Sequence, residues 1–212
     1  MTYEFYTDGA ATMRQVNGEY VREAGGWAFA FKDNGNIYCS SGHEDHTTNQ
    51  AMELRAIYEA LLYYWKYYFS PSAATTLKIY SDSAYSINIC TTWRFGWKRN
   101  KWQRKGNKPI ENLEIIKKID ELLDEMNVGF NSVEFVKVKG HNGDEMNELV
   151  DQFAVNAKKT GKEVVDYFCD EYIYPCGRKL EIAELAEHGR SGYILTSREM
   201  ENVFKKEVES QS

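Results

Sequence analysis

The sequence predicts an α/β fold in which helices pack on a mixed β-sheet. Three strands come first, and they are followed by a helix, a strand, further helices, a strand and a helix. A run of strands followed by alternating strands and helices is typical of such a mixed sheet. At roughly 100–200 residues per domain, the length of 212 residues indicates one domain, or one domain with an extension.

The first three strands are expected over Tyr3–Thr7, Gly26–Phe31 and Ile37–Ser41. The first ends at Asp8-Gly9, and the second and third pair across the turn Asp33-Asn34-Gly35-Asn36. Between the first two strands the sequence is polar over Ala10–Gly25, and we expect a long connection there.

The first helix begins at Thr47/Thr48, follows a period near 3.6 residues through Phe69, and is stopped by Ser70-Pro71. The order then predicts strands at 77–80 and 133–138 and helices at 84–92, 112–126 and 146–157. Residues 1–158 would form one catalytic domain. Residues 159–212 would form a C-terminal extension of unassigned role, with a terminal helix near 197–209.

The composition excludes several classes of protein. Mean hydropathy is −0.60, and no run of about 18 apolar residues is present to span a membrane. No signal peptide is visible at the N-terminus. The four cysteines form no CxxC pair, which argues against a disulfide scaffold and a cysteine zinc site. We therefore expect a cytoplasmic protein.

The charge is distributed unevenly along the chain. The net charge is −6, yet the segment Trp93–Lys108 carries seven cations and no acid, together with three tryptophans. A concentrated basic, aromatic segment in an otherwise acidic protein indicates a polyanionic partner.

Four carboxylates are candidates for chemistry, although each has a simpler explanation. Asp8 and Asp82 each follow a strand, where they would also serve as a turn former or a helix N-cap. Glu53 shares the apolar stripe of the first helix, unless the register leaves it at the wet edge. Asp151 lies early in the last helix, where the helix dipole stabilises an acid in any case.

Taken together, the four acids predict a metal site. Two follow strands and two lie on helices that would pack beside those strands, and converging carboxylates cannot all ionise without counter-charge. Oxygen ligands suit hard cations such as Mg²⁺ or Mn²⁺. Two such ions support phosphodiester hydrolysis. His141, in the loop before the last helix, is a lone histidine of the kind that is usually only solvated.

Five segments resemble, in order, the motifs of type 1 ribonuclease H of the bacterial kind. These are YTDGA (6–10), TTNQAMEL (47–54), YSDSAYSI (80–87), TTWRFGWKRNKW (91–102) and VKGHNGDEMNELVDQFA (138–154). The resemblance covers about residues 1–158 and leaves the extension unexplained.

The resemblance implies a ribonuclease H-like fold, a five-stranded mixed sheet of order 3-2-1-4-5 flanked by helices. It implies hydrolysis of the RNA strand of RNA–DNA hybrids, leaving 5′-phosphate and 3′-hydroxyl ends. Asp8, Glu53, Asp82 and Asp151 match the ligands of two Mg²⁺ ions, with Mn²⁺ as the alternative. His141 matches an auxiliary group for proton transfer or product release.

The resemblance also assigns substrate contacts. We further expect a monomer that does not associate with a membrane. Asn49 and Gln50 match readers of 2′-hydroxyl groups or bases, and Thr48 and Asn112 match a pocket for a DNA phosphate. The channel for the DNA strand and its phosphate contacts would comprise Tyr85, Trp93, Trp97, Lys98, Arg99, Lys101 and Trp102.

The sequence departs from the family pattern at Ala84, where some members have a glutamine, and at His46, where some have an arginine. Two alternatives remain open: a nuclease of the same fold that cuts DNA, and a non-catalytic hybrid-binding module. Asn49, Gln50 and the basic loop argue against the first, and the four acids argue against the second. An alternative for the basic loop itself is a solvated hairpin with core tryptophans.

Overall fold

The computed structural model describes residues 1–106, 108–140 and 143–170. Its elements in chain order are β1 (Thr2–Val16), β2 (Glu19–Asp33), β3 (Asn36–Glu44), α1 (Asn49–Tyr67), β4 (Thr76–Ser81), α2 (Ala84–Asn88), the π-helical turn η1 (Ile89–Trp93), α3 (Arg94–Arg99), α4 (Leu113–Met126), β5 (Ser132–Lys137), α5 (Glu145–Thr160) and β6 (Val164–Asp170).

The six strands form one mixed sheet of order β5-β4-β1-β2-β3-β6. Strands β1, β4 and β5 run parallel, and β2, β3 and β6 are added in antiparallel pairs. The predicted order of the first five strands, 3-2-1-4-5, is therefore confirmed. The sixth strand lies within residues 159–212, so the sheet includes residues beyond the predicted boundary at 158. The predicted helix near 197–209 lies outside the described residues.

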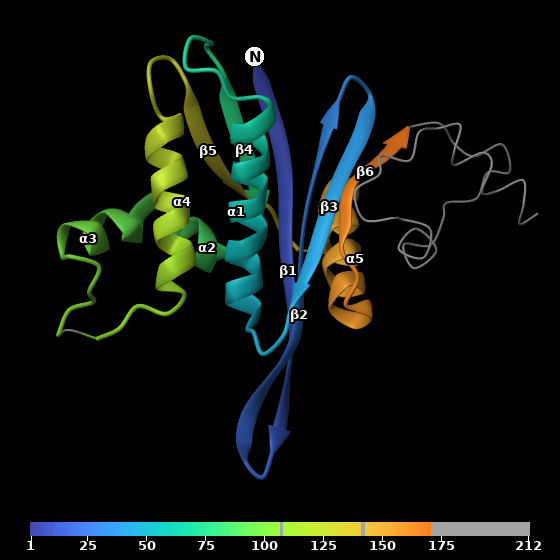
Figure 1. Cartoon of the computed structure of the whole chain (residues 1–212), viewed down its shortest axis with the longest axis vertical. Helices are drawn as coiled ribbons and strands as arrows, with labels where there is room; N and C mark the ends of the chain where they lie inside the picture. Colours follow the sequence, from blue (N-terminus) through green and yellow to red (C-terminus); the bar gives the residue numbers. More distant parts are fainter. Residues whose placement is uncertain (107, 141–142, 171–212) are drawn as a thin grey trace, which may run out of the picture.

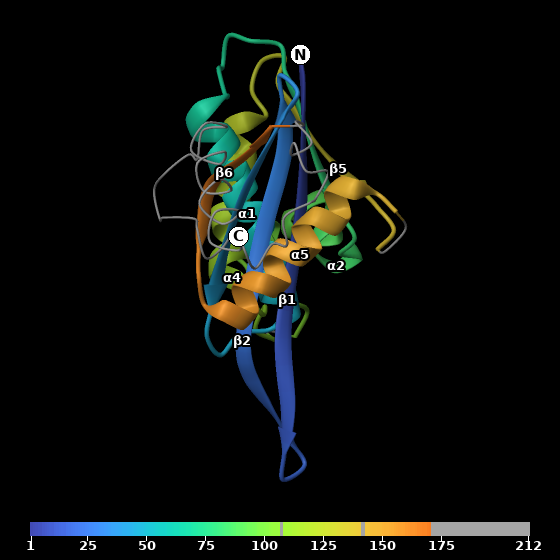
Figure 2. The same ribbon diagram turned by 90° about the vertical axis from the view of Figure 1, so that its right-hand side faces the viewer.

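Helices cover the two faces of the sheet unequally. Helices α1 and α4 pack on one face, over a core that includes Phe5, Phe31 and Leu61. Helix α5 crosses the opposite face over β1, β2 and β3 (Figure 2), where Val150 and Phe153 are completely buried. The sequence predicted the ends of these three helices to within a few residues. Among the described residues, no helix combines the length and the apolar character needed to cross a bilayer.

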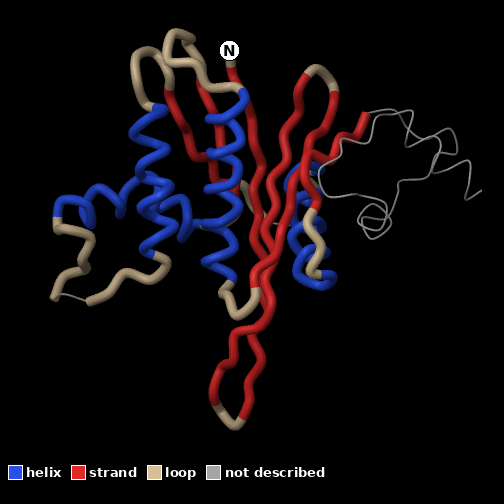
Figure 3. Tube along the Cα trace, viewed as in Figure 1, coloured by secondary structure: helices blue, strands red, loops and turns tan. Residues whose placement is uncertain are grey.

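The polar segment Ala10–Gly25 is not a loop, contrary to the sequence-based expectation. Strands β1 and β2 continue through it as a two-stranded ribbon that projects from the body (Figures 1 and 3). Its turn is formed by Asn17 and Gly18, whose φ angles are 51° and 87°. Two positive φ angles at Asn-Gly are the signature of a tight hairpin turn. The pattern was hidden because both faces of the ribbon are exposed and carry polar residues.

The basic segment also differs from the expected hairpin or loop. Its first part is the short helix α3, continuous with α2 and η1 (Figure 3). The segment leaves the body on the side of α4 and returns to it at Ile110, which is buried.

Two glycines bring helices into close contact with the central strands. A Cβ atom on Gly9 would lie 2.2 Å from the backbone nitrogen of Glu53, and one on Gly26 would lie 2.1 Å from the carbonyl oxygen of Ala154. No side-chain rotation relieves such contacts, because the obstructing atoms belong to the backbone. Glycine is therefore required where β1 meets α1 and where β2 meets α5.

Gly9→Ala should lower the free energy of unfolding by about 1–3 kcal/mol, the usual cost of overpacking. Gly96→Ala is the matched control, because a Cβ atom there meets nothing within 4 Å. In a helix this control should be neutral or stabilising by up to about 1 kcal/mol. Urea unfolding of both variants measures the difference, and equal stabilities would contradict the close approach of α1 to β1.

Candidate active site

Asp8 and Asp82 are brought together by parallel pairing of β1 and β4. The pairing register places Tyr6 beside Tyr80, and each aspartate follows its tyrosine by two residues. The two carboxylates therefore emerge from adjacent strands on the same face. The Asp8 Oδ1 atom accepts a hydrogen bond of 2.7 Å from the backbone N–H of Gly9.

Glu53 reaches the same place from α1. Its exposed fraction is only 5%, so the alternative in which it lies at the wet edge of the helix is wrong. Its Oε1 atom lies 3.5 Å from the side-chain nitrogen of Asn49. Its Oε2 atom is buried and has no hydrogen-bond partner. A buried carboxylate oxygen without a partner is costly unless something absent from the bare chain satisfies it.

Three of the four predicted acids, Asp8, Glu53 and Asp82, form one cluster, and Asp151 lies near Asp8. Ligand oxygens of Asp8, Glu53 and Asp82 lie within 4.8 Å of one another. Asp151, on α5, lies close enough to Asp8 for its negative charge to help raise the pKa of Asp8. Helix α5 is oriented at its start by Asp144, whose Oδ1 accepts hydrogen bonds of 3.1 Å from the backbone of Met146 and Asn147.

Crowding in a dry environment raises the pKa of two of these acids. Burial, and then the neighbouring charge of Asp82, raise the pKa of Asp8 to about 7. Burial, and then the charge of Asp8, raise the pKa of Glu53 well above its ordinary value. Without counter-charge, the cluster therefore retains protons near neutral pH.

The donor set fits divalent metal ions. All the ligand atoms are carboxylate oxygens, which hard cations such as Mg²⁺ and Mn²⁺ prefer. The unpartnered Oε2 of Glu53 supplies an oxygen that such an ion would satisfy. In the metal-free chain, protons bound to the carboxylates supply part of the positive charge that a metal ion would bring.

His141 lies outside the described residues, so its predicted role stays a prediction. The residue before it, Gly140, lies against the cluster: a Cβ atom there would be 2.7 Å from Oδ2 of Asp82. Gly140 is thus a third glycine at a close contact, here between a loop and the side chain of Asp82.

The predicted reader segment lies at the N-terminal end of α1. Thr48 caps the helix, with its hydroxyl accepting a 3.2 Å hydrogen bond from the backbone of Ala51. Asn49 and Gln50 are both exposed. The side-chain oxygen of Asn49 also accepts a 3.1 Å hydrogen bond from the backbone of Ala11, at the base of the ribbon. This contact ties the ribbon to the segment, and no pattern in the sequence indicated it.

Aromatic rings contact one another at the N-terminal end of the basic segment. Tyr85 and Trp93 meet edge to face at 5.9 Å, and Trp93 and Trp97 also lie 5.9 Å apart. Trp93 is 38% exposed, whereas Trp97 and Trp102 are partly buried against the main core. Trp97 and Trp102 therefore help to attach the segment to the body, and the Trp93 ring remains open to a partner.

The remaining substrate candidates are Tyr85, Asn112 and three cations, and the cations differ in exposure and in ion pairing. Burial raises the pKa of Tyr85, and the nearby side chain of Asn112 partly offsets this shift. Arg99 and Lys101 are exposed. Lys98 instead forms ion pairs with Asp120 and Asp124 of α4, so its charge is already balanced within the protein. A cavity of about 440 Å³ beside Asn112 is also lined by Ala51 and Lys118.

The sheet order and the cluster of Asp8, Glu53 and Asp82 place this molecule in the ribonuclease H-like class of enzymes. The family model described as RNase H matches residues 1–159. A ribonuclease H of Syntrophomonas wolfei is 36% identical over 156 residues, which cover 73% of this chain and 94% of that protein. A ribonuclease H of Thermoanaerobacter sp. (strain X514) is 34% identical over 157 residues, covering 74% and 89%.

Solved structures show the same fold at lower sequence identity. LC9-RNase H1, a type 1 RNase H with the type 2 active-site motif, superposes with a TM-score of 0.61 at 22% identity, covering 89% of this chain and 85% of that chain. The foamy viral protease-reverse transcriptase in complex with RNA/DNA hybrid gives a TM-score of 0.58 at 19% identity, covering 74% and 20%. The chain belongs to the ribonuclease H family and is a ribonuclease H enzyme. Enzymes of this family depend on divalent metal ions, and the acid cluster fits that requirement.

The raised pKa of Asp8 predicts how stability depends on pH in metal-free buffer. Because the folded state binds a proton more tightly than the unfolded state, stability should fall as the pH rises from about 4 through about 7. Asp8→Asn removes this titration, so its stability should fall less over the same range. Urea unfolding in the presence of a chelator measures both slopes, and parallel slopes would contradict the crowding of the acids.

Proposed function

We propose that this protein hydrolyses the RNA strand of RNA–DNA hybrids, leaving 5′-phosphate and 3′-hydroxyl ends. The observation that carries the proposal is the position of the acid cluster beside exposed Asn49, which contacts Glu53 directly. A group able to read a 2′-hydroxyl thus lies next to the groups that would carry the chemistry.

The four acids would hold two divalent ions, with Mg²⁺ as the expected metal and Mn²⁺ as the alternative. Bound there, the ions would supply an activated water and stabilise the leaving oxygen. The chain itself contributes the geometry: β1 and β4 fix Asp8 and Asp82, and α1 holds Glu53 in a dry position. His141 would assist proton transfer or product release from its loop.

Discrimination between the strands would depend on two different surfaces. The amides of Asn49 and Gln50 can both donate to and accept from a 2′-hydroxyl, which DNA lacks. The faces of Trp93 and Trp97, with Tyr85, would fit deoxyribose, and Thr48 and Asn112 would receive a DNA phosphate.

A nuclease of the same fold acting on duplex DNA is the alternative that an assay must exclude. The test compares cleavage of hybrid, duplex RNA, duplex DNA and single-ribonucleotide substrates, with and without Mg²⁺. The proposal requires Mg²⁺-dependent cleavage of the RNA strand of the hybrid. Preferential cleavage of duplex DNA would overturn it.

Asp82→Asn should reduce hybrid cleavage to below a few per cent at saturating Mg²⁺, because one charged ligand of the ions is lost. His141→Ala should slow turnover by up to about 10²-fold without abolishing it, as for a general acid–base group. Single-turnover rates with 5′-labelled RNA measure both effects. Wild-type activity in Asp82→Asn would exclude Asp82 as a metal ligand.

Trp93→Ala should weaken the preference for hybrid over duplex RNA, because an aromatic face recognises the shape of the sugar rather than a charge. The dependence of affinity on salt should stay nearly constant, since no phosphate contact is removed. Binding titrations with the two duplexes at several salt concentrations measure both quantities. Tyr67→Ala, which removes an exposed ring from the end of α1, serves as a control and should change neither.

A further inference from the structure

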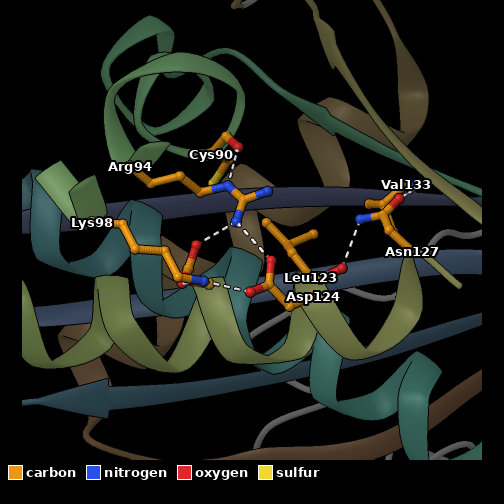
Figure 4. Close-up of polar contacts among 8 residues, drawn as sticks. Cys90, Arg94, Lys98, Leu123, Asp124, Asn127 and Val133 are labelled. Carbon is orange, nitrogen blue, oxygen red and sulfur yellow. Dashed lines mark hydrogen bonds and ion pairs between the residues drawn. The ribbon is translucent and has the colours of Figure 1, made fainter. Parts of the chain in front are cut away.

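An ionic network connects the basic segment to α4. Arg94 and Lys98 of α3 face Asp120 and Asp124, which lie one turn apart on α4 (Figure 4). Two of the seven cations that the sequence places in this segment are thus paired with acids from outside it. The effect on substrate binding depends on which acids neutralise which cations.

The buried half of the network is balanced internally. The side chains of Arg94 and Asp120 are 7% and 3% exposed, and they form a direct ion pair. The Nε atom of Arg94 also donates a 2.8 Å hydrogen bond to the backbone oxygen of Cys90. Buried charges are tolerated only when paired and hydrogen-bonded in this way, so Arg94 and Asp120 are fixed parts of the fold.

The exposed half leaves Asp124 to neutralise Lys98. The Nζ atom of Lys98 lies 2.7 Å from Oδ2 of Asp120, whose charge Arg94 already compensates. Lys98 also contacts Asp124, and these two side chains are 44% and 53% exposed. Contact with Asp120, and then with Asp124, raises the pKa of Lys98, and contact with Lys98 lowers that of Asp124. Arg94 also lies 3.5 Å from Asp124, so the four side chains form a network without net charge, of which Lys98 and Asp124 are the exposed members.

We propose that Asp124 withholds Lys98 from the phosphates of a bound nucleic acid, and so lowers both the affinity and its salt dependence. This inference rests on the proposed function, because it takes the hybrid as the ligand. A carboxylate and a phosphate are both anionic oxygen acceptors for the same ammonium group, so they compete for it. A lysine paired with a carboxylate releases few counterions from the duplex, whereas an unpaired lysine releases about one. Of the three cations assigned to phosphates here, Arg99 and Lys101 would bind without this competition.

Asp124→Asn should bind the hybrid more tightly and steepen the plot of log affinity against log salt by up to about 0.9, the value for one phosphate contact. As the salt concentration rises from 50 to 200 mM, the affinity of Asp124→Asn relative to that of the wild type should therefore fall by up to about 3.5-fold. Binding is measured with the full chain and a hybrid duplex, without divalent ions, so that no cleavage occurs.

Glu125→Gln is the matched control. It removes one exposed acid from the neighbouring position of the same helix, and no ion pair of Glu125 is present among the described residues. It should leave the slope nearly unchanged. Lys98→Ala should have little effect on the slope in the wild type, but should return the slope of Asp124→Asn to the wild-type value.

Equal slopes for Asp124→Asn and Glu125→Gln would overturn the proposal, provided that both variants unfold cooperatively near the wild-type temperature. A flattening of about 0.9 by Lys98→Ala alone would also overturn it, because Lys98 would then already contact a phosphate. The cleavage assay with Mg²⁺ separates the two levels of inference. Failure of the wild type to cleave hybrids contradicts the proposed function, whereas cleavage with equal slopes contradicts only the role of Asp124.

Discussion

The structure depends on holding several carboxylates close together in a largely buried position. Burial, and then repulsion between like charges, raise the pKa of Asp8 to about 7. The acids come from β1, α1, α5 and the end of β4, so no local segment can relax the repulsion by itself. The sheet and the two helices packed on it must therefore be rigid enough to hold the acids in place. The main core on one face and the smaller core under α5 on the other provide that rigidity.

Backbone contacts around the acids explain how the helices come so close. Gly9 allows α1 to rest on β1 directly beside Asp8, and Gly26 allows α5 to rest on β2. Gly140 permits the loop after β5 to approach Asp82. At Gly9 a side chain would separate β1 from α1, the two elements that carry Asp8 and Glu53.

The sequence predicted most of the domain because its core is regular. The strands that carry Phe5 and Ile79 have apolar residues on alternate positions, and α1 has an apolar stripe, so both periods were visible. Asp8 was recognisable because it directly follows a predicted strand, and Asp82 because it lies two residues after another. The position of Glu53 remained ambiguous until its burial was known, because one acid on a stripe does not fix the helix register.

Other features were unpredictable because they depend on contacts between distant segments or on exposed elements. The ribbon over Ala10–Gly25 has no buried face and so no alternation, and only Asn17-Gly18 marked its turn. Strand β6 pairs with β3 at the edge of the sheet, which a boundary drawn from motifs did not include. The neutralisation of Lys98 requires acids 22 and 26 residues away, on another helix. Counting the cations along the basic segment therefore overstated how many are available to a nucleic acid.

The central claim is that divalent ions relieve a repulsion that the fold imposes. The most direct test is the melting temperature of the wild-type chain as Mg²⁺ is added, compared with a Glu53→Gln, Asp82→Asn double variant that lacks two of the acids. A ligand that binds only the folded state should raise the melting temperature progressively above its dissociation constant. The account predicts a clear rise in the wild type and little change in the double variant. Equal responses of the two proteins, or no response in the wild type at millimolar Mg²⁺ or Mn²⁺, would contradict it.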